Sequence, residues 1–319
     1  MTAVKIRIPT HDQVCNFCSA NDAEVIARGM DFEYETCANE FTYVRCKSCG
    51  HLYLNPLPDP ATLDIIYPAN YGNFEENRNT VFTFKVKNWL DRRYLRKLTK
   101  GLHVERILDI GCADGRMLAL CRDALPDVQC LEGIEFSRNS AKQAMERGFT
   151  VHVGSADQLK LPDNYFDLIF LQQVIEHVFD PTALVQKLYH SLRENGRVCF
   201  EMPTSEAIDR YFGGKRYWGG YHFPRHFNIF SERNFCTICE RAGFTVISVA
   251  YRYQPVHWVW TVHHWLKEKG VSPVICEWFN IKNTWLMAIG TVMEALAKLV
   301  SGKAANMQII VEKKPHAKN

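Results

Sequence analysis

Residues 106–118 read Arg-Ile-Leu-Asp-Ile-Gly-Cys-Ala-Asp-Gly-Arg-Met-Leu, an apolar run that leads into a glycine turn. Ile107 and Leu108 are residue types of a buried parallel strand. Gly111 and Gly115 allow a sharp turn and a close approach to a bound molecule, because neither carries a Cβ. In an open α/β sheet, ligands bind where such a strand meets the following helix. The stretch therefore predicts an α/β fold with a ligand at this turn.

The spacing of the turn disfavours a dinucleotide. The dinucleotide fingerprint is Gly-x-Gly-x-x-Gly, and the spacing of residues 111–115 fails the third element of that pattern. Asp109 and Asp114 would repel a phosphate, so a ligand with a neutral or cationic end fits better. The stretch 109–115 resembles the first motif of class I S-adenosylmethionine-dependent methyltransferases, usually Asp-x-Gly-x-Gly-x-Gly. Ala113 stands in place of the middle glycine.

Further segments up to residue 202 resemble the same family in the right order. The apolar segment 128–134 ends in Glu135, and a carboxylate about 20 residues beyond the glycine turn suits the hydroxyls of a ribose. The resemblance implies that Asp157 binds the adenine amino group and that Gln173 lies at the exit of the fourth strand. Each acid alone would also suit a solvated or capping position. Three acids that each follow a strand indicate a ligand.

Two Cys-x-x-Cys pairs, Cys15 with Cys18 and Cys46 with Cys49, predict a zinc ribbon. Each tight loop places two thiolates about 2.3 Å from one Zn²⁺, and two loops complete a tetrahedron. Four sulfur ligands leave no position for water, so the predicted metal is structural. A ribbon of about 45 residues has too small a core to fold alone, and the ion supplies the missing stability. Disulfides or unliganded thiols are the alternative.

The predicted zinc ribbon restricts the resemblance to a smaller group of methyltransferases. Zinc knuckles before a methyltransferase core resemble enzymes of bacterial sugar, polysaccharide and secondary-metabolite pathways, including the deoxysugar C-methyltransferases. Residues 67–72 resemble the tyrosine segment that lies over the cofactor in such proteins, and packing onto the ribbon is the alternative. The predicted cofactor-binding residues are Asp109, Gly111, Ala113, Gly115, Glu135, Asp157, Gln173 and Tyr71.

A histidine-rich segment follows the fifth strand. Residues 221–231 resemble the Tyr-His-Glu-His-Leu-x-Tyr-Phe-Ser segment of the deoxysugar enzymes, whose last histidine acts at the active site and matches His226. An imidazole suits the removal of a hydroxyl proton, so His226 is the expected general base, with His222 second. A hydrogen-bonded packing role for His226 is the alternative. Arg225 stands where the family has glutamate, and its planar fork would pair with a phosphate or carboxylate of the substrate.

The C-terminal part departs from the family pattern. The family joins its sixth strand, here 244–249, by a short hairpin to a seventh strand, which 307–311 matches. Instead, residues 256–300 intervene and hold five of the seven tryptophans. Two helices are expected there, 256–268 and 275–300, the second broken near 280–283. No uninterrupted apolar run reaches the length of a bilayer span. A substrate lid, a homodimer contact and peripheral membrane contact remain open as roles.

Composition restricts partner and location. Thirty-eight basic and 35 acidic residues give a net charge of +3 without a clustered basic face, so no nucleic-acid partner is expected. The first ten residues lack the apolar core of a signal peptide, and twelve cysteines without an export signal point to a reducing compartment. We therefore expect a cytoplasmic or membrane-peripheral protein.

Together these patterns predict a seven-stranded Rossmann-like methyltransferase sheet with helices on both faces. The predicted parts are a zinc ribbon (1–60), a helical lid or linker (61–104), a methyltransferase core (105–255 and 303–315) and a Trp-rich helical insertion (256–302). The expected cofactors are S-adenosylmethionine and one structural Zn²⁺. The expected reaction is O-methylation of a small molecule, a sugar or a lipid-linked glycan or secondary-metabolite intermediate. C-methylation is one alternative, and a cofactor-sensing binding module whose ribbon recognises a macromolecule is another.

Overall fold

A computed structural model describes residues 6–68, 71, 81–212 and 216–315, with only the backbone described for 81–88. The chain forms two compact units. The ribbon unit comprises Met1–Pro68, Met202–Thr237 and Val249–Gln308, and the core unit comprises Ala69–Glu201, Ile238–Ser248 and Ile309–Asn319. The ribbon unit thus includes residues 202–237, which the predicted boundaries assign to the methyltransferase core. Those domain boundaries stay a prediction.

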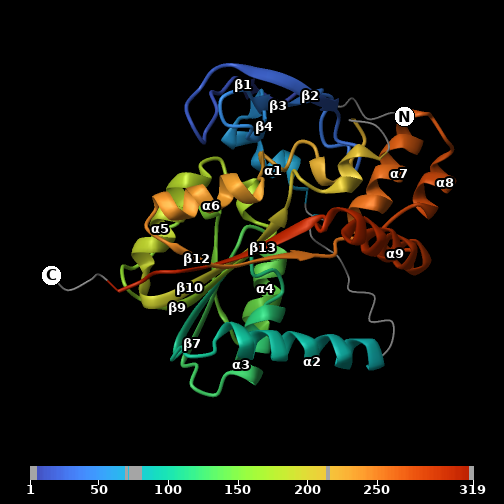
Figure 1. The fold of residues 1–319 in the computed structure, drawn as a ribbon. Coiled ribbons are helices and arrows are strands. Elements are labelled where there is room, and N and C mark those ends of the chain that lie inside the picture. Colours follow the sequence, from blue (N-terminus) through green and yellow to red (C-terminus); the bar gives the residue numbers. More distant parts are fainter. Residues whose placement is uncertain (1–5, 69–70, 72–80, 213–215, 316–319) are drawn as a thin grey trace. The chain divides into compact units, whose positions relative to one another are not determined.

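A seven-stranded sheet carries the fold, in the order β12-β13-β10-β9-β6-β7-β8 (Figure 1). Its strands are β6 (Arg106–Ile110), β7 (Cys130–Glu135), β8 (Thr150–Val153), β9 (Phe166–Gln172), β10 (Leu192–Pro203), β12 (Thr245–Arg252) and β13 (Asn306–Glu312). The pairs β10–β9, β9–β6, β6–β7 and β7–β8 run parallel. Residues of the central strand β9 are buried except the last, as expected for a strand covered on both faces. The predicted Rossmann-like methyltransferase sheet is confirmed.

Helices cover both faces of this sheet. They are α2 (Val81–Leu98), α3 (Arg116–Ala124), α4 (Arg138–Glu146), α5 (Pro181–Ser191) and α6 (Glu232–Arg241), with short 3-10 turns η2 (Ala156–Gln158) and η3 (Ile175–His177). Leu95 of α2 and Leu120 of α3 share a buried cluster with Phe170 of β9. Figure 1 shows α5 on the side of the sheet away from α2 and α3. At the start of α5, the Asp180 side chain accepts a hydrogen bond from the Ala183 amide, 2.9 Å away.

The ribbon unit contains a second, antiparallel sheet in the order β11-β4-β3-β2. Its strands are β2 (Ala23–Gly29), β3 (Phe41–Cys46), β4 (Leu52–Leu54) and β11 (Asn228–Ile229), and β1 (Thr10–His11) pairs separately with β5 (Leu57–Pro58). The turns η1 (Pro60–Thr62), α1 (Leu63–Ile66), η4 (Ile208–Tyr211) and η5 (Gly219–Tyr221) complete its short elements. Asn228 of β11 pairs with Tyr53 of β4, so the segment after the histidines forms the edge strand of the ribbon sheet.

The Trp-rich segment forms three helices, α7 (Val256–Glu268), α8 (Pro273–Trp278) and α9 (Thr284–Ser301). The predicted helix 256–268 and the predicted break are confirmed. Asn283 caps α9, because its side chain accepts from the Trp285 amide, and Gly302 ends it in the left-handed conformation, φ 74°. Among the described residues, α9 is long and apolar enough to cross a membrane by length and composition. The expectation that no uninterrupted apolar run reaches this length is not contradicted, because Glu294 and Lys298 interrupt the apolar sequence of the helix. It carries a buried acid, Glu294, which accepts a hydrogen bond from Trp258 Nε1 at 2.7 Å.

Candidate functional site

The turn between β6 and α3 has the geometry of a ligand cradle. Gly111, Ala113 and Gly115 adopt φ values of 76°, 48° and 80°, so each second residue lies in the left-handed region. A Cβ on Gly111 would come within 2.4 Å of Val174 Cγ2, so both conformation and space require glycine there. Ala113 adopts the same backbone despite its methyl group, and it is exposed. Alanine is therefore accommodated at the position where the family motif has glycine.

Two carboxylates stand at this edge of the sheet. Glu135 ends β7 and accepts hydrogen bonds from the Ala113 amide (2.9 Å) and the Ser137 amide (2.7 Å). Glu135 therefore stabilises the backbone of the glycine turn through the Ala113 amide. Asp109 is 3% exposed, and burial together with the charge of Glu135 raises its pKa to about 8. A ligand that carries hydroxyl or cationic donors would satisfy both groups.

Two of the other predicted cofactor residues, Asp157 and Gln173, follow strands β8 and β9 of the sheet. Asp157 in η2 accepts from the Phe179 amide (3.0 Å), and burial raises its pKa. Gln173 follows β9 with φ 55°, and its buried Nε2 lacks a hydrogen-bond partner among the described residues. Tyr71 is half-buried in a turn, and the neighbouring residues 69–70 and 72–80 lie outside the described part. The roles of these residues, and the tyrosine lid, stay predictions.

These features fit S-adenosylmethionine. The glycine cradle admits a close backbone approach, Glu135 and Asp109 offer oxygens to hydroxyl groups, and the buried Nε2 of Gln173, directly after β9, has no hydrogen-bond partner among the described residues. In parallel sheets, ligands bind outside the carboxyl ends of the strands, and Ile110 of β6 aligns with Ile134 of β7 and Leu171 of β9. The fold and this edge define a class I S-adenosylmethionine-dependent methyltransferase.

Comparisons with known proteins agree with this class. A family model described as "Methyltransferase domain" matches residues 83–249, about half of the chain. The chain belongs to this family. The crystal structure of a putative sarcosine dimethylglycine methyltransferase from Galdieria sulphuraria superposes with a TM-score of 0.50 at 17% identity, covering 72% of this chain and 86% of that one. That likeness concerns the fold alone.

Curated relatives are similar over part of their length. Demethylmenaquinone methyltransferase from Bacillus licheniformis is 27% identical over 151 residues, 45% of this chain and 63% of the relative. Ubiquinone biosynthesis O-methyltransferase from Haemophilus ducreyi is 27% identical over 132 residues, 39% of this chain and 56% of the relative. The chain thus spans less than two thirds of these relatives, and their names do not define its acceptor.

The four predicted zinc ligands are gathered in the ribbon unit. The sulfur atoms of Cys15, Cys18, Cys46 and Cys49 all lie within 4.8 Å of one another. Cys15 Sγ lies 3.6 Å from Cys49 Sγ, and Cys18 Sγ lies 3.5 Å from Cys46 Sγ. A tetrahedral site with bonds of about 2.3 Å separates its sulfurs by roughly 3.8 Å, whereas a disulfide requires about 2.05 Å. The cluster suits a metal, and none of the twelve cysteines is in a disulfide.

The two knuckles share one local geometry. Ser19 after the first pair and Gly50 after the second both adopt left-handed φ values, 60° and 74°. The Ser19 amide bonds to the Cys15 carbonyl, and the Gly50 amide bonds to the Cys46 carbonyl. Burial opposes thiolate formation at Cys46, but backbone amides outweigh it and lower its pKa to about 7. Zinc remains a prediction that this geometry supports.

Both predicted catalytic histidines lie in the ribbon unit. His226 is 7% exposed, and its Nδ1 lies 2.8 Å from the Gly220 carbonyl. Because a carbonyl only accepts, Nδ1 carries the hydrogen and Nε2 holds the lone pair. The His222 ring lies 5.0 Å from the His226 ring, centroid to centroid. The two imidazoles are therefore neighbours, and their catalytic role stays a prediction.

The expectation for Arg225 is wrong. Its side chain is completely buried and forms a bidentate pair with Asp31, with nitrogen–oxygen distances of 3.0 and 2.8 Å. Its Nε donates to the Ile66 carbonyl at 2.7 Å. The guanidinium is thus occupied within the protein and is not available to a substrate anion. The buried carboxylate of Asp31 occupies the guanidinium that was expected to bind a phosphate or carboxylate of the substrate.

Sequence reasoning missed the acidic segment 31–35, Asp-Phe-Glu-Tyr-Glu. Its three acids pair with bases far along the chain: Asp31 with Arg225, Glu33 with His222 and His264, and Glu35 with Lys267. The acids alternate with aromatic residues, which is the signal that would have drawn attention to the segment. No local motif indicates which bases these acids pair with, because the partners lie about 190 to 230 residues further along the chain.

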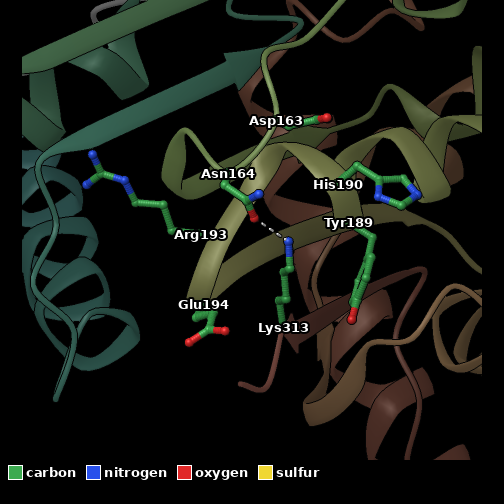
Figure 2. A pocket seen from close by; sticks show the side chains of 7 residues that line it. All are labelled: Asp163, Asn164, Tyr189, His190, Arg193, Glu194 and Lys313. Atoms are coloured by element: carbon green, nitrogen blue, oxygen red, sulfur yellow. Dashed lines mark hydrogen bonds between the residues drawn. The ribbon is translucent and has the colours of Figure 1, made fainter. Parts of the chain in front are cut away.

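The core unit has a hollow of about 570 Å³, and none of the residues that line it is a predicted cofactor residue (Figure 2). Its lining residues are Asp163, Asn164, Tyr189, His190, Arg193, Glu194 and Lys313. Asn164 directly precedes β9, so the hollow lies at the amino ends of the parallel strands. Lys313 Nζ donates to Asn164 Oδ1 (2.9 Å) and to the Leu192 carbonyl (2.7 Å), so its charge is used internally.

One face of α9 is exposed. Large apolar side chains with high exposed fractions follow helical spacing, from Trp285 (79%) to Leu299 (83%). Val274 and Trp278 of α8 are exposed as well. An apolar surface of this kind suits a partner, and its role as lid, homodimer contact or peripheral membrane contact stays a prediction.

Proposed function

We propose that this S-adenosylmethionine-dependent methyltransferase transfers a methyl group to an oxygen of a small molecule. The proposed acceptor is a sugar, or a lipid-linked glycan or secondary-metabolite intermediate, and the proposed location is cytoplasmic or membrane-peripheral. The main support is the imidazole pair His222 and His226, because a hydroxyl acceptor must lose a proton that a neutral imidazole can take. The relatives include an enzyme named as an O-methyltransferase.

In this proposal, one set of residues binds the cofactor and another removes the proton of the acceptor. Bound S-adenosylmethionine supplies an electrophilic methyl group on a sulfonium. Asp109, Gly111, Glu135 and Asp157 hold and orient the nucleoside, and alignment supplies much of the rate. An imidazole Nε2 of the 221–226 loop would take the proton that the acceptor hydroxyl gives up, and S-adenosylhomocysteine would leave as the carbon–sulfur bond of the donor breaks. The proton then passes to water, which restores the neutral imidazole.

Product analysis tests this proposal. The full-length protein is incubated with methyl-¹³C S-adenosylmethionine and a panel of monosaccharides, nucleotide sugars and phenols. We expect a ¹³C methoxy signal from at least one hydroxylated acceptor, lost in Asp109→Ala. A methyl signal on carbon would favour C-methylation. Binding of the cofactor without product from any acceptor class would favour the cofactor-sensing module.

A further inference from the structure

The later part of α2 and the turn after it carry a strong local excess of positive charge. Residues 85–100 contain seven lysines and arginines and one acid, Asp91, whereas the net charge of the whole chain is only +3. The rest of the chain is therefore slightly acidic. A basic segment in an otherwise slightly acidic chain is typical of a surface that meets an anionic partner.

One face of α2 packs on the core unit and has its charges neutralised there. Leu95 is completely buried among residues of α3 and β9. Asp91 pairs with Arg116 of α3 at 2.5 Å, and Arg92 pairs with Asp123 of α3 at 2.8 Å. These contacts fix which side of the helix is turned toward the sheet and which side is left to solvent.

The opposite face of α2 is basic and exposed. Arg93, Arg96 and Lys97 are exposed, and Lys100 is exposed in the turn that follows the helix. The first three lie four, seven and eight positions after Trp89, which is the spacing of one helical face. None of the four cations forms an ion pair with a residue in the described part of the chain. The face therefore presents four positive charges that the core unit does not neutralise.

Two large apolar side chains lie at the start of this basic face. Trp89 is 58% exposed, and Leu90 is 52% exposed. The guanidinium carbon of Arg93 lies 5.8 Å from the centre of the Trp89 ring, so an aromatic ring and a cation are neighbours on the surface. Helices that lie in a membrane interface combine these residue types, with apolar groups at the acyl boundary and cations among the headgroups.

The apolar residues favour a lipid surface over a nucleic acid. Phosphate groups of either partner would attract the four cations, but an exposed leucine gains nothing from a phosphate backbone. At an acyl boundary, Leu90 and the ring of Trp89 would both leave water. From Trp89 to Lys100 the face spans about 16 Å along the helix, a length that a flat headgroup layer contacts at once.

We propose that the exposed face of α2 docks the enzyme on an anionic membrane surface. The face consists of Trp89, Leu90, Arg93, Arg96, Lys97 and Lys100. Its partner is a lipid layer whose phosphodiester headgroups carry negative charge. The inference goes beyond the proposed O-methylation and holds for any methyl acceptor. It brings the enzyme to the surface at which a lipid-linked acceptor would lie.

Vesicle flotation with the full chain tests the docking. Vesicles of phosphatidylcholine and phosphatidylglycerol are compared with vesicles of phosphatidylcholine alone. We expect at least about tenfold stronger binding to the anionic vesicles, and loss of this difference in about 1 M salt, where the Debye length is about 3 Å. Equal binding to both kinds of vesicle at low salt, or no binding to either, would overturn the inference.

Removal of the charges tests the face itself. Arg93→Gln/Arg96→Gln/Lys97→Gln removes three of its four cations, all of them exposed. Each lysine or arginine near an anionic surface strengthens binding about fivefold, so this variant should bind the anionic vesicles about 100-fold more weakly. Binding within threefold of the wild type would overturn the inference. The comparison of vesicles with the wild type stands by itself if the variant does not fold.

Lys142→Gln/Lys160→Gln/Lys314→Gln is the matched control. It removes three exposed cations of the core unit that lie outside α2, so the net charge changes by the same amount. The control should bind the anionic vesicles within threefold of the wild type. An equal loss of binding in both triple variants would show a dependence on net charge alone and would contradict a specific role for α2.

Two further measurements separate the alternatives. Trp89→Gln/Leu90→Gln keeps all four cations and should weaken binding to the anionic vesicles several-fold, because the apolar contribution is lost. A single-stranded oligonucleotide that binds the wild type more tightly than the anionic vesicles do would assign the face to nucleic acid and overturn the proposal. Product analysis in solution uses no vesicles, so failure of the O-methylation and failure of the docking are seen separately.

Discussion

The cofactor edge of the core unit and the histidine cluster of the ribbon unit are built in opposite ways. At the cofactor edge, the decisive residues lie within one short stretch, from Asp109 to Gly115, and the next strand adds Glu135. In the ribbon unit, Glu33 and Asp31 meet bases nearly 200 residues further along the chain. The first site is therefore visible as a motif, while the second exists only after folding.

The largest expected effect is on the ribbon unit alone. Cys46→Ser/Cys49→Ser should abolish binding of one zinc per chain and destabilise the ribbon unit by several kcal/mol, because metal binding supplies its folding energy. S-adenosylmethionine binding should persist, since the predicted cofactor residues belong to the core unit. Metal analysis and calorimetry measure the two quantities. A metal-free wild type with an intact fold would refute the zinc site.

Breaking the buried Asp31–Arg225 pair should have the next largest effect. Asp31→Ala removes the carboxylate that neutralises a guanidinium with no exposure, and we expect the free energy of unfolding to fall by about 3–5 kcal/mol. Asp31→Leu/Arg225→Met removes both charges and should recover much of that loss. Urea unfolding compares the variants. A double variant as unstable as Asp31→Ala would show that the pair does more than neutralise charge.

At the cofactor edge, stability should depend on pH through Asp109. Its pKa is about 8 in the folded chain against 3.8 for the ordinary group, so the folded state binds a proton that the unfolded state releases. The free energy of unfolding should therefore fall as pH rises from about 4 to 8, by at most roughly 1.4 kcal/mol per pH unit. Asp109→Asn should flatten this slope in the cofactor-free protein and weaken cofactor binding. Unfolding curves from pH 5 to 9 provide the test, and parallel slopes in the two proteins would contradict it.

The smallest effect concerns the exposed face of α9. Trp285→Gln/Leu299→Gln should leave the free energy of unfolding within about 0.5 kcal/mol, because both side chains are exposed. If this face contacts lipid, flotation with vesicles should fall several-fold, with cofactor binding unchanged. Val25→Gln, at an exposed apolar position of β2, is the control. Unaltered flotation would exclude the membrane contact, and light scattering would then test the homodimer.

The positions of the core strands and the glycine turn could be predicted because their signals are local. Parallel strands give continuous apolar runs, and glycine spacing fixes the turn at Gly111, which is why β6 to β9 and β13 fall where the sequence places them. The cysteine pairs were visible for the same reason. The two-helix pattern and its break near 280–283 followed from the periodicity of the apolar residues.

Contacts between distant segments could not be predicted in this way. Arg225 carries the residue type of an anion-binding group, and only the burial of Asp31 against it shows that the charge is already neutralised. Likewise, nothing near His222 in sequence indicates that a carboxylate at position 33 binds its ring. The spacing of residues in a sequence shows the periodicity within one helix or strand. Ion pairs between distant segments, such as Asp31 with Arg225, depend on the tertiary structure.

The pairing of β11 with β4 has a consequence for the evolution of the chain. A small appended module can ordinarily be lost or exchanged without touching the residues that perform chemistry. Here Asn228 and Ile229, just after His226, form the outermost strand of that module. Deleting the first 60 residues would strip this strand of its hydrogen-bonded neighbour. The two distant stretches should therefore be inherited together, and a homologue that lacks one should have rebuilt the other.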